Sequence, residues 1–561
     1  MKLSLLLKKR KTFTFLLLIT LLAAFLRFWQ LGVVPPGLFG DEADTGYQAY
    51  SILKTGRDYF GNLFPVHFQS YGDWRMPLYI YFDSLFVGIF GLNEIGVRLP
   101  AAMIGILAVL VSYFLAQVVS QKKTVGLLTA FLVAISPWHI HFSRGAFEAI
   151  FLTLLFPLGV VFFLKALSSK ATRDYFISAF LFGLTPYAYN TPKLLLPLVI
   201  IVLLFIYKKE LFSQRKKLVV FLMALGLILL PMIGDTLGGP GAARFSSLSI
   251  FNDETVPERV RLARQASSLP ASYQRLFYNK VGFWTQDFID NYLSSFSTQF
   301  LFIRGDPSPR QSVGGRGELY LFELPFLLLG LGFFFYQAFK RKEKLARLIL
   351  AFVFLTPLPA ALTQGGGEHA IRLLSIIPWL HLVIATGMVY FFQDLVRKKW
   401  RKIFWVGLIL TAFTSLSLFL INYFDLYPKV SGRWWNFGYR EVFNYVNQVE
   451  SQYQQIYISP SWEPSLVYTL FYSQYSPQEA QKELTLSSYR VGKYWFLTPN
   501  IGQLKRDEGE PRTLYVLNPA ELEVHGLKLE EEPSLVKIKE IISPDGSKAF
   551  IIFSSRDVVK E

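Results

Sequence analysis

Long apolar runs separated by short polar segments fill the first 421 residues of the chain. Eleven of these runs have roughly 16 to 25 residues, which is long enough for a helix to cross a bilayer. A further run, Pro77–Gly91, has about fifteen residues and contains Asp83, so it is either another span or a helix in the membrane interface. The pattern predicts transmembrane helices near residues 13–33, 95–119, 124–141, 147–167, 174–189, 192–207, 217–234, 318–339, 345–363, 370–392 and 401–421.

Lysine and arginine residues gather in every second loop. If those loops face the cytoplasm, the positive-inside rule is obeyed only when residues 77–91 do not cross the membrane. We therefore expect an interfacial helix there, a cytoplasmic N-terminus in the cell membrane, and outer loops at 34–94 and 235–317. The basic clusters are Lys8–Lys11, Lys122–Lys123, Lys170 with Arg173, Lys208–Lys217, Lys340–Lys342 and Arg397–Lys402.

The sequence changes character near residue 422. The tail is polar, and short stretches such as Gln455–Ile458 and Lys548–Phe553 combine apolar residues with strand-like patterning. We predict two domains, a membrane domain at 1–421 and a small extracytoplasmic α/β domain at 422–561.

Composition agrees with a membrane protein, since 52% of the residues are hydrophobic and 17% are aromatic. The chain has no cysteine, which excludes disulfides, thiolate metal ligands and cysteine nucleophiles. The net charge of +17 lies mostly in the loops, so anionic lipid explains it and a nucleic-acid partner is not needed.

Three acids stand in four positions directly after the first apolar run: Asp41, Glu42 and Asp44. Gly40 followed by Asp41 suggests a helix that begins there with Asp41 as its N-cap. One interpretation is a solvated helix cap. The other, which we favour, is a functional carboxylate, because acids held at the mouth of a span are costly unless they have a role.

Other polar residues are expected on the same outer face. Arg144 and Glu148 are four residues apart, which suits a structural ion pair as well as a substrate contact. His139 and His141 do not share a helix face, so a zinc site would need ligands from elsewhere. We expect no metal or other cofactor, and a divalent cation is the one addition considered.

Lysine and arginine on the outer face are candidates for binding an anion such as a lipid phosphate. Lys193 opens a predicted span, where snorkelling of its side chain is the alternative explanation. Arg244 and Arg372 lie near glycine runs in outer loops. Neither glycine run resembles a nucleotide-binding loop.

These features resemble the GT-C fold glycosyltransferases that use polyprenyl-phosphate sugars, a family that includes relatives of the protein O-mannosyltransferases and of the lipid A aminoarabinose transferase. The resemblance rests on Gly40–Glu42, Arg75–Leu78, Asn93–Pro100, Ser143–Arg144 with Glu148, Lys193, and the segments at 300–306 and 317–326. It implies a polytopic fold of about 11–13 transmembrane helices with outer juxtamembrane helices.

The resemblance also implies chemistry. An undecaprenyl-phosphate-like sugar is the expected donor, and a protein, lipid or envelope glycan is the expected acceptor. Asp41 and Glu42 are implied as catalytic residues, and Lys193, Arg372 and Arg244 as ligands of the donor phosphate. The expected substrate cavity adds Asp44, Arg75, Arg144, Glu148, Tyr189 and His369.

Two alternatives remain at this stage. Trp434–Gly438 is similar to the W-W-D-Y-G signature of oligosaccharyltransferases, but Asn436 and Phe437 replace its Asp and Tyr. A non-catalytic lipid or polysaccharide transporter is the second alternative, although its polar residues would be expected at mid-membrane depth rather than at outer helix ends.

Overall fold

A computed structural model describes residues 2–71, 73–239, 247–459, 464–485, 488–497, 512–524 and 535–555. The chain forms two compact units. The first contains residues 1–29, 101–143 and 147–419, and the second contains residues 30–100, 144–146 and 420–561. Residues 30–100 therefore group with the C-terminal part of the chain.

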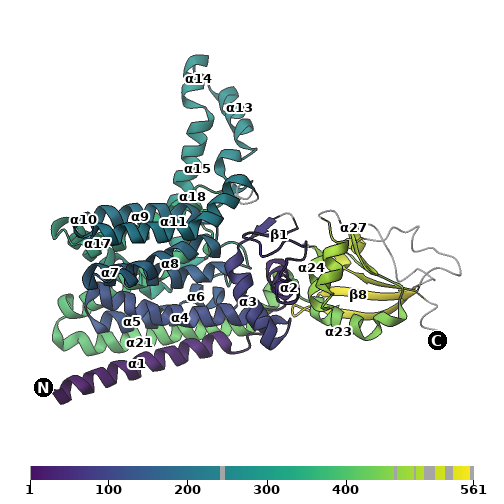
Figure 1. Cartoon of the computed structure of the whole chain (residues 1–561), viewed down its shortest axis with the longest axis horizontal. Coiled ribbons are helices and arrows are strands. Elements are labelled where there is room, and N and C mark those ends of the chain that lie inside the picture. Colours follow the sequence, from purple (N-terminus) through teal and green to yellow (C-terminus); the bar gives the residue numbers. More distant parts are fainter. Residues whose placement is uncertain are drawn as a thin grey trace. The chain divides into compact units, whose positions relative to one another are not determined.

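The first unit is helical (Figure 1). Its helices are α1 (Lys2–Phe28), α4 (Glu94–Ser120, from residue 101), α5 (Lys123–Ile135), α6 (Pro137–Phe142), α7 (Leu152–Ser169), α8 (Thr172–Ala188), α9 (Pro192–Ile206), α10 (Lys208–Ser213), α11 (Arg215–Gly238), α13 (Val256–Ala266), α14 (Ala271–Phe277), α15 (Lys280–Ser294), α16 (Leu324–Phe335), α17 (Lys344–Leu355), α18 (Pro357–Ala361), α19 (Ala370–Leu373), α20 (Ile377–Tyr390) and α21 (Lys398–Ile421).

Each of the eleven predicted spans coincides with helix. Within the described residues, eight helical segments are long and apolar enough to cross a membrane. The predicted spans at 124–141, 174–189 and 192–207 correspond to shorter helices, α5 with α6, α8 and α9. The prediction of a polytopic helical membrane protein is confirmed.

Helix α20 lies at the centre of the bundle and is buried along almost its whole length. It packs against α16 and α5. Gly330 of α16 and Gly387 of α20 allow close approach, because a Cβ at Gly387 would lie 2.0 Å from the carbonyl oxygen of Phe326. Trp379 of α20 stacks on Phe352 of α17 with ring centroids 3.8 Å apart.

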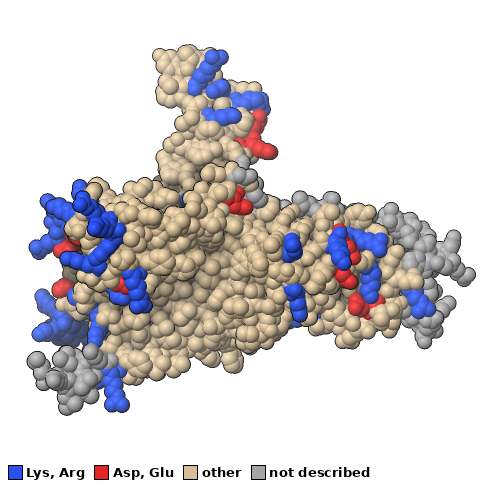
Figure 2. Space-filling view, in the orientation of Figure 1, with Lys and Arg blue, Asp and Glu red and all other residues tan. Residues whose placement is uncertain are grey.

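Lysine and arginine gather at one end of the helical unit (Figure 2). The exposed residues Lys122, Lys208, Lys340 and Arg397 belong to the loops whose charge predicts a cytoplasmic location. Because successive spans alternate in direction, the chain after α11 leaves the bundle at the opposite end.

The second unit begins with helix α2 (Gly40–Thr55), the hairpin of β1 (Phe68–Ser70) and β2 (Asp73–Arg75), and helix α3 (Pro77–Phe90). Gly56 ends α2 in a left-handed conformation with φ of 69°, and its N–H donates to the carbonyl oxygen of Ile52. Helix α3 has 14 residues and, like α5 and α9, is one of the shorter apolar helices, so its interfacial location stays a prediction.

The C-terminal part of this unit contains a six-stranded mixed sheet in the order β4-β5-β3-β6-β8-β7. It confirms the predicted small α/β region. The strands are β3 (Gln455–Ile458), β4 (Arg490–Val491), β5 (Tyr494–Trp495), β6 (Thr513–Leu517), β7 (Leu535–Ile542) and β8 (Lys548–Ser555), and the helices are α22 (Tyr427–Ser431), α23 (Tyr439–Val449), α24 (Ser465–Tyr472), α25 (Pro477–Glu483) and α27 (Pro519–Val524).

Helix α2 packs against α3 on one side and against α24 and α25 of the C-terminal part on another. The Tyr47 hydroxyl donates to the carbonyl oxygen of Tyr475 at 3.0 Å. Gly46 fits closely, since a Cβ there would meet Phe471 at 2.6 Å. The acid-bearing helix is therefore an integral part of the second unit.

Candidate active site

Asp41 and Asp44 share one arginine. Helix α2 begins at Gly40, so Asp41 lies in its first turn rather than at the N-cap, which is Phe39. The Asp41 carboxylate accepts a hydrogen bond from Arg75 at 2.7 Å, and its side chain is 39% exposed. Arg75 also donates to Asp44 at 3.1 Å. Asp41 is thus a fixed carboxylate that still faces solvent.

Asp44 is buried and has two partners, Arg75 and the hydroxyl of Tyr59, which donates to it at 2.6 Å. Burial raises the pKa of Asp44 above its ordinary value, although Arg75 and Tyr59 oppose the change. Because both carboxylates bind Arg75, Asp44 helps to orient Arg75 and thereby Asp41.

Glu42 has a different environment. Arg98 at the start of α4 donates to both of its oxygens at 2.9 Å, and the N–H of Ala146 donates to Oε1 at 2.8 Å. Both side chains are fully buried. These donors hold the Glu42 carboxylate in one position, where it ties α2 to the start of α4 and to the turn at Ala146.

Arg98 is the centre of this network, and sequence reasoning did not select it as a site residue. Besides Glu42, its guanidinium donates to the carbonyl oxygens of Leu31, Pro35 and Gly37. These carbonyls belong to the turn that leads into α2. The sequence did contain a signal for this role, since Arg98 is a charged residue near the start of the predicted span at 95–119.

Trp435 covers this network. Its ring lies 5.6 Å from the Arg98 guanidinium and makes an edge contact with Phe39 at 5.3 Å. Its indole N–H donates to the Tyr427 hydroxyl at 2.7 Å. Trp434, by contrast, is 44% exposed. The second tryptophan of the Trp434–Gly438 segment therefore has a packing role.

Asp83 of α3 is a second residue that sequence reasoning left without a role. It is completely buried, and neither of its oxygens has a hydrogen-bond partner among the described residues. Nothing in the structure assigns it a function.

Arg144 is buried in the turn that follows α6. It donates to the carbonyl oxygen of Val34 at 2.8 Å, and its guanidinium lies 5.4 Å from the ring centroid of Tyr423. Burial lowers its pKa from the ordinary arginine value. The helical i, i+4 relation to Glu148 is wrong, because a turn separates α6 from the short helix that begins at Glu148.

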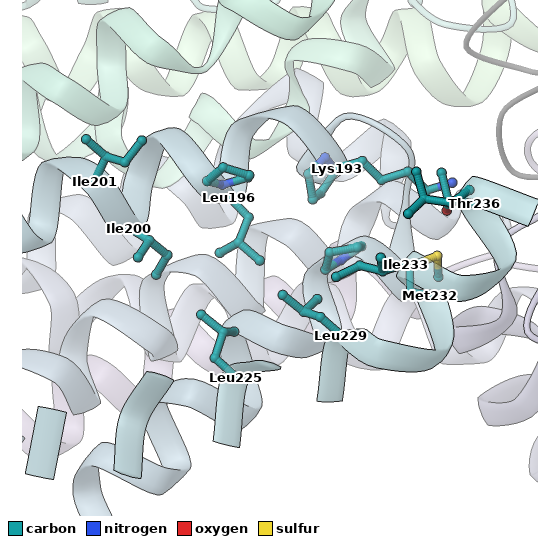
Figure 3. Close-up of a pocket in the computed structure, with 13 residues that line it drawn as sticks. Lys193, Leu196, Ile200, Ile201, Leu225, Leu229, Met232, Ile233 and Thr236 are labelled. Atoms are coloured by element: carbon teal, nitrogen blue, oxygen red, sulfur yellow. The ribbon is translucent and has the colours of Figure 1, made fainter. Parts of the chain in front are cut away.

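Lys193 lies in the first turn of α9, and its backbone N–H donates to the carbonyl oxygen of Asn190 at 3.0 Å. It lines a cavity of ≈ 470 Å³ between α9 and α11. Figure 3 shows Leu196 and Ile200 of α9 along one side of this groove and Leu225 and Leu229 of α11 along the other, with Lys193 and Thr236 near one end. Tyr189, at the end of α8, is buried and does not line the groove.

Arg372 belongs to a loop cluster in the first unit. It donates to the Thr363 hydroxyl at 2.6 Å and to the Gln364 carbonyl oxygen at 3.1 Å. His369 Nδ1 lies 3.7 Å from Asp306 Oδ2, which is too long for a hydrogen bond. Burial and the nearby Arg372 lower the pKa of His369 to about 3, so this imidazole is neutral at pH 7.

Asp306 joins two loops in this cluster, because its carboxylate accepts the N–H groups of Ser308 and Ala370 at 2.8 Å. Burial raises its pKa to about 6. The folded state therefore binds the proton more tightly than the unfolded state, whose pKa is about 3.9.

This difference predicts that stability falls as the pH rises from about 4 to about 6, with a slope of at most about 1.4 kcal/mol per pH unit from this group. The Asp306→Asn variant should lack this dependence of stability on pH. Thermal unfolding of the parent protein and of the variant at several pH values measures the difference. Equal slopes for the two proteins would contradict the prediction.

The predicted phosphate ligand Arg244 lies outside the described residues. His139 Nδ1 accepts a hydrogen bond from the Arg27 guanidinium at 2.7 Å, whereas His141 Nε2 contacts the Arg310 carbonyl oxygen at 2.8 Å. Within the part of the chain that the structure describes, no group of three or more His, Asp or Glu side chains could hold a metal ion.

Residues 75–233 match the family described as dolichyl-phosphate-mannose-protein mannosyltransferase. The matched segment begins at Arg75, contains Lys193 and covers less than half of the chain. It does not include Asp41. No curated protein sequence matches the chain.

Solved structures with similar folds are known. ArnT from Cupriavidus metallidurans bound to undecaprenyl phosphate has a TM-score of 0.53 and 10% identity, with 96% of this chain and 97% of that chain covered. An Archaeoglobus fulgidus oligosaccharyltransferase has a TM-score of 0.51 and 15% identity over 83% of this chain, which spans only 64% of that protein.

The archaeal oligosaccharyltransferase AglB from the same organism, in complex with an inhibitory peptide and a dolichol-phosphate, has a TM-score of 0.51 and 14% identity, with 83% of this chain and 64% of that chain covered. At such identities the likeness defines the fold. The chain therefore has the GT-C fold, and its residues 75–233 match the mannosyltransferase family model.

Proposed function

We propose that the protein is an inverting glycosyltransferase that moves a monosaccharide from a polyprenyl-phosphate donor to a hydroxyl group of a protein, lipid or envelope-glycan acceptor. The reaction takes place on the outer face of the cell membrane. Fold neighbours support the donor class, since one was crystallised with undecaprenyl phosphate and another was solved with dolichol-phosphate and a peptide.

The observation that carries the proposal is the groove between α9 and α11. Apart from Lys193 and Thr236, all of its lining side chains are apolar. Leucine, isoleucine and proline side chains suit an isoprenoid chain, and the ammonium of Lys193 at one end suits the phosphate to which that chain is attached. A polyprenyl phosphate has this same division into a long apolar part and one anionic head.

The chemistry requires a base and a stabilised leaving group. Asp41 accepts the proton of the acceptor hydroxyl while that oxygen bonds to the anomeric carbon. The bond from this carbon to the phosphate oxygen breaks, and polyprenyl phosphate leaves with the bonding electrons. Lys193 and Arg372 neutralise the charge on the leaving phosphate. One displacement inverts the configuration at the anomeric carbon.

Lys193→Met tests the donor site because methionine keeps the apolar stem and removes the charge. A charged hydrogen bond contributes about 1.5–3 kcal/mol, so binding of undecaprenyl phosphate should weaken about 10- to 100-fold. The measurement is equilibrium binding of the lipid to the full chain in nanodiscs. Lys208→Met is the matched control, since Lys208 stands just beyond the other end of α9.

Equal affinities of the Lys193→Met and Lys208→Met variants would exclude Lys193 from the donor site. The reaction itself is tested by supplying labelled polyprenyl-phosphate sugars to membranes that contain the chain and identifying the labelled product. A product that forms only with the chain supports transfer. Movement of intact lipid without a new glycosidic bond would favour a transporter.

A further inference from the structure

A helical arm leaves the bundle between α11 and α16. It consists of α13, α14 and α15 and projects away from the long helices, across their direction (Figure 1). Its base is fixed to the bundle. Asn291 of α15 donates to the carbonyl oxygens of Ala361 and Thr363, and Tyr292 donates to that of Phe354. The arm thus extends sideways from the bundle end that lies opposite the basic loops.

The distal part of the arm, residues 262–286, is apolar on its surface. Its exposed large hydrophobic side chains are Leu262, Leu269, Tyr273, Leu276, Phe277 and Val281, and the exposed fractions of Leu276 and Phe277 are 66% and 62%. Tyr273 shares one face of α14 with Leu276 and Phe277, which follow it by three and four residues. No residue of α14 is buried.

The same distal part is basic. Residues 262–286 contain Arg264, Arg275 and Lys280 and no acid. The acids of the arm lie nearer its base, where Asp287 pairs with Arg259 and Glu258 pairs with Arg261. Outer loops are usually poor in lysine and arginine, so cations there need an anionic partner.

A hollow between α13 and α14 supplies room for an anionic group. Its volume is ≈ 350 Å³, and it is lined by Pro257, Val260, Arg261, Arg264, Gln265 and Gln274. Arg264 uses its Nε to donate to the carbonyl oxygen of Tyr278, and its guanidinium suits a phosphate, whereas Arg261 already pairs with Glu258.

We infer that residues 262–286 form a membrane anchor that inserts its apolar side chains into the lipid leaflet and binds anionic phospholipid headgroups through its cations. Exposed apolar residues with neighbouring cations are typical of interfacial helices. The sideways direction of the arm keeps its tip near the ends of the spans, where headgroups lie. The inference is independent of the transfer reaction.

The chain has no cysteine, so single cysteines report on the arm in the full-length protein. A nitroxide is attached to Leu276→Cys, Phe277→Cys or Ala271→Cys, and the protein is placed in nanodiscs of phosphatidylcholine with or without phosphatidylglycerol. Ala271 is the matched control, because it is exposed on the opposite face of α14.

At positions 276 and 277 we expect greater accessibility to oxygen than to a water-soluble nickel complex, with a depth of about 5–10 Å below the lipid phosphates. At position 271 the order should reverse. Replacing Arg264, Arg275 and Lys280 by Gln should reduce insertion in phosphatidylglycerol roughly five-fold for each cation removed, and leave it unchanged in pure phosphatidylcholine.

Two outcomes overturn the inference. In the first, the nitroxides at positions 276 and 277 are as accessible to the nickel complex as the nitroxide at position 271, in both lipid mixtures. That result would mean that the arm is exposed to water. In the second, a bis-maleimide efficiently crosslinks the Leu276→Cys variant between two chains, and the nitroxide at position 276 stays shielded from the nickel complex in detergent. That result would make the arm an interface with a second copy of this chain.

Discussion

Asp41→Asn should lower the rate of sugar transfer about 100- to 10,000-fold, the range by which a positioned general base accelerates a reaction. The amide keeps the size of the side chain and can still accept a hydrogen bond from Arg75, which lies 2.7 Å from the carboxylate. It cannot accept the proton of the acceptor hydroxyl. The measurement is transfer of labelled sugar by the purified chain, together with equilibrium binding of undecaprenyl phosphate, which should be unchanged.

Asp73→Asn is the matched control. Asp73 approaches the same arginine at 4.0 Å and is partly exposed, so the substitution makes a similar change of charge beside Arg75. Transfer by this variant should stay close to that of the parent protein. If Asp41→Asn transfers sugar as fast as Asp73→Asn does, Asp41 is not the base, and a transport function or a structural role becomes the better explanation.

Arg98→Met should destabilise the second unit by about 3–5 kcal/mol, because it leaves the Glu42 carboxylate buried without its charged partner. The carbonyl oxygens of Leu31, Pro35 and Gly37 also lose their donor. Thermal unfolding in detergent, followed by tryptophan fluorescence, measures the change. Transfer should be lost together with the structure around Asp41.

The double variant Arg98→Met with Glu42→Met separates charge from packing. The double variant removes the unpaired carboxylate, so part of the lost stability should return. Its stability should stay below that of the parent protein, because the three carbonyl oxygens still lack their donor. Arg261→Gln serves as the exposed control, since its pair with Glu258 lies at the surface and its removal should not change unfolding measurably. A double variant as unstable as Arg98→Met would show that the carbonyl contacts dominate.

The membrane part of the fold was predictable because its signals are local. The length of an apolar run and the charges that flank it define a span, and all eleven predicted spans contain helix. The helix at Pro77–Phe90 also followed from its apolar run, and its interfacial location remains a prediction from the rule of charge. The arm of α13, α14 and α15 was not predicted, because its helices are too short and too polar to stand out from a connecting loop.

The candidate site was predictable only where residues close in sequence act together. The cluster of acids marked the start of α2, and Arg75 entered through the family resemblance. Arg98, Tyr59 and Trp435 were missed, since Arg98 and Glu42 are 56 residues apart and Trp435 follows almost 400 residues after α2. Such contacts depend on the assembled fold, and no spacing rule within a helix or strand indicates them.

The contact of Trp435 with Arg98 has a consequence for biosynthesis. The acid-bearing helix leaves the ribosome early, but the residue that covers its supporting arginine is made only after the last span. During synthesis the buried pair of Glu42 and Arg98 therefore lacks its final cover. The helix that carries Asp41 should therefore reach its full stability only after Trp435 has been made and has packed against Arg98.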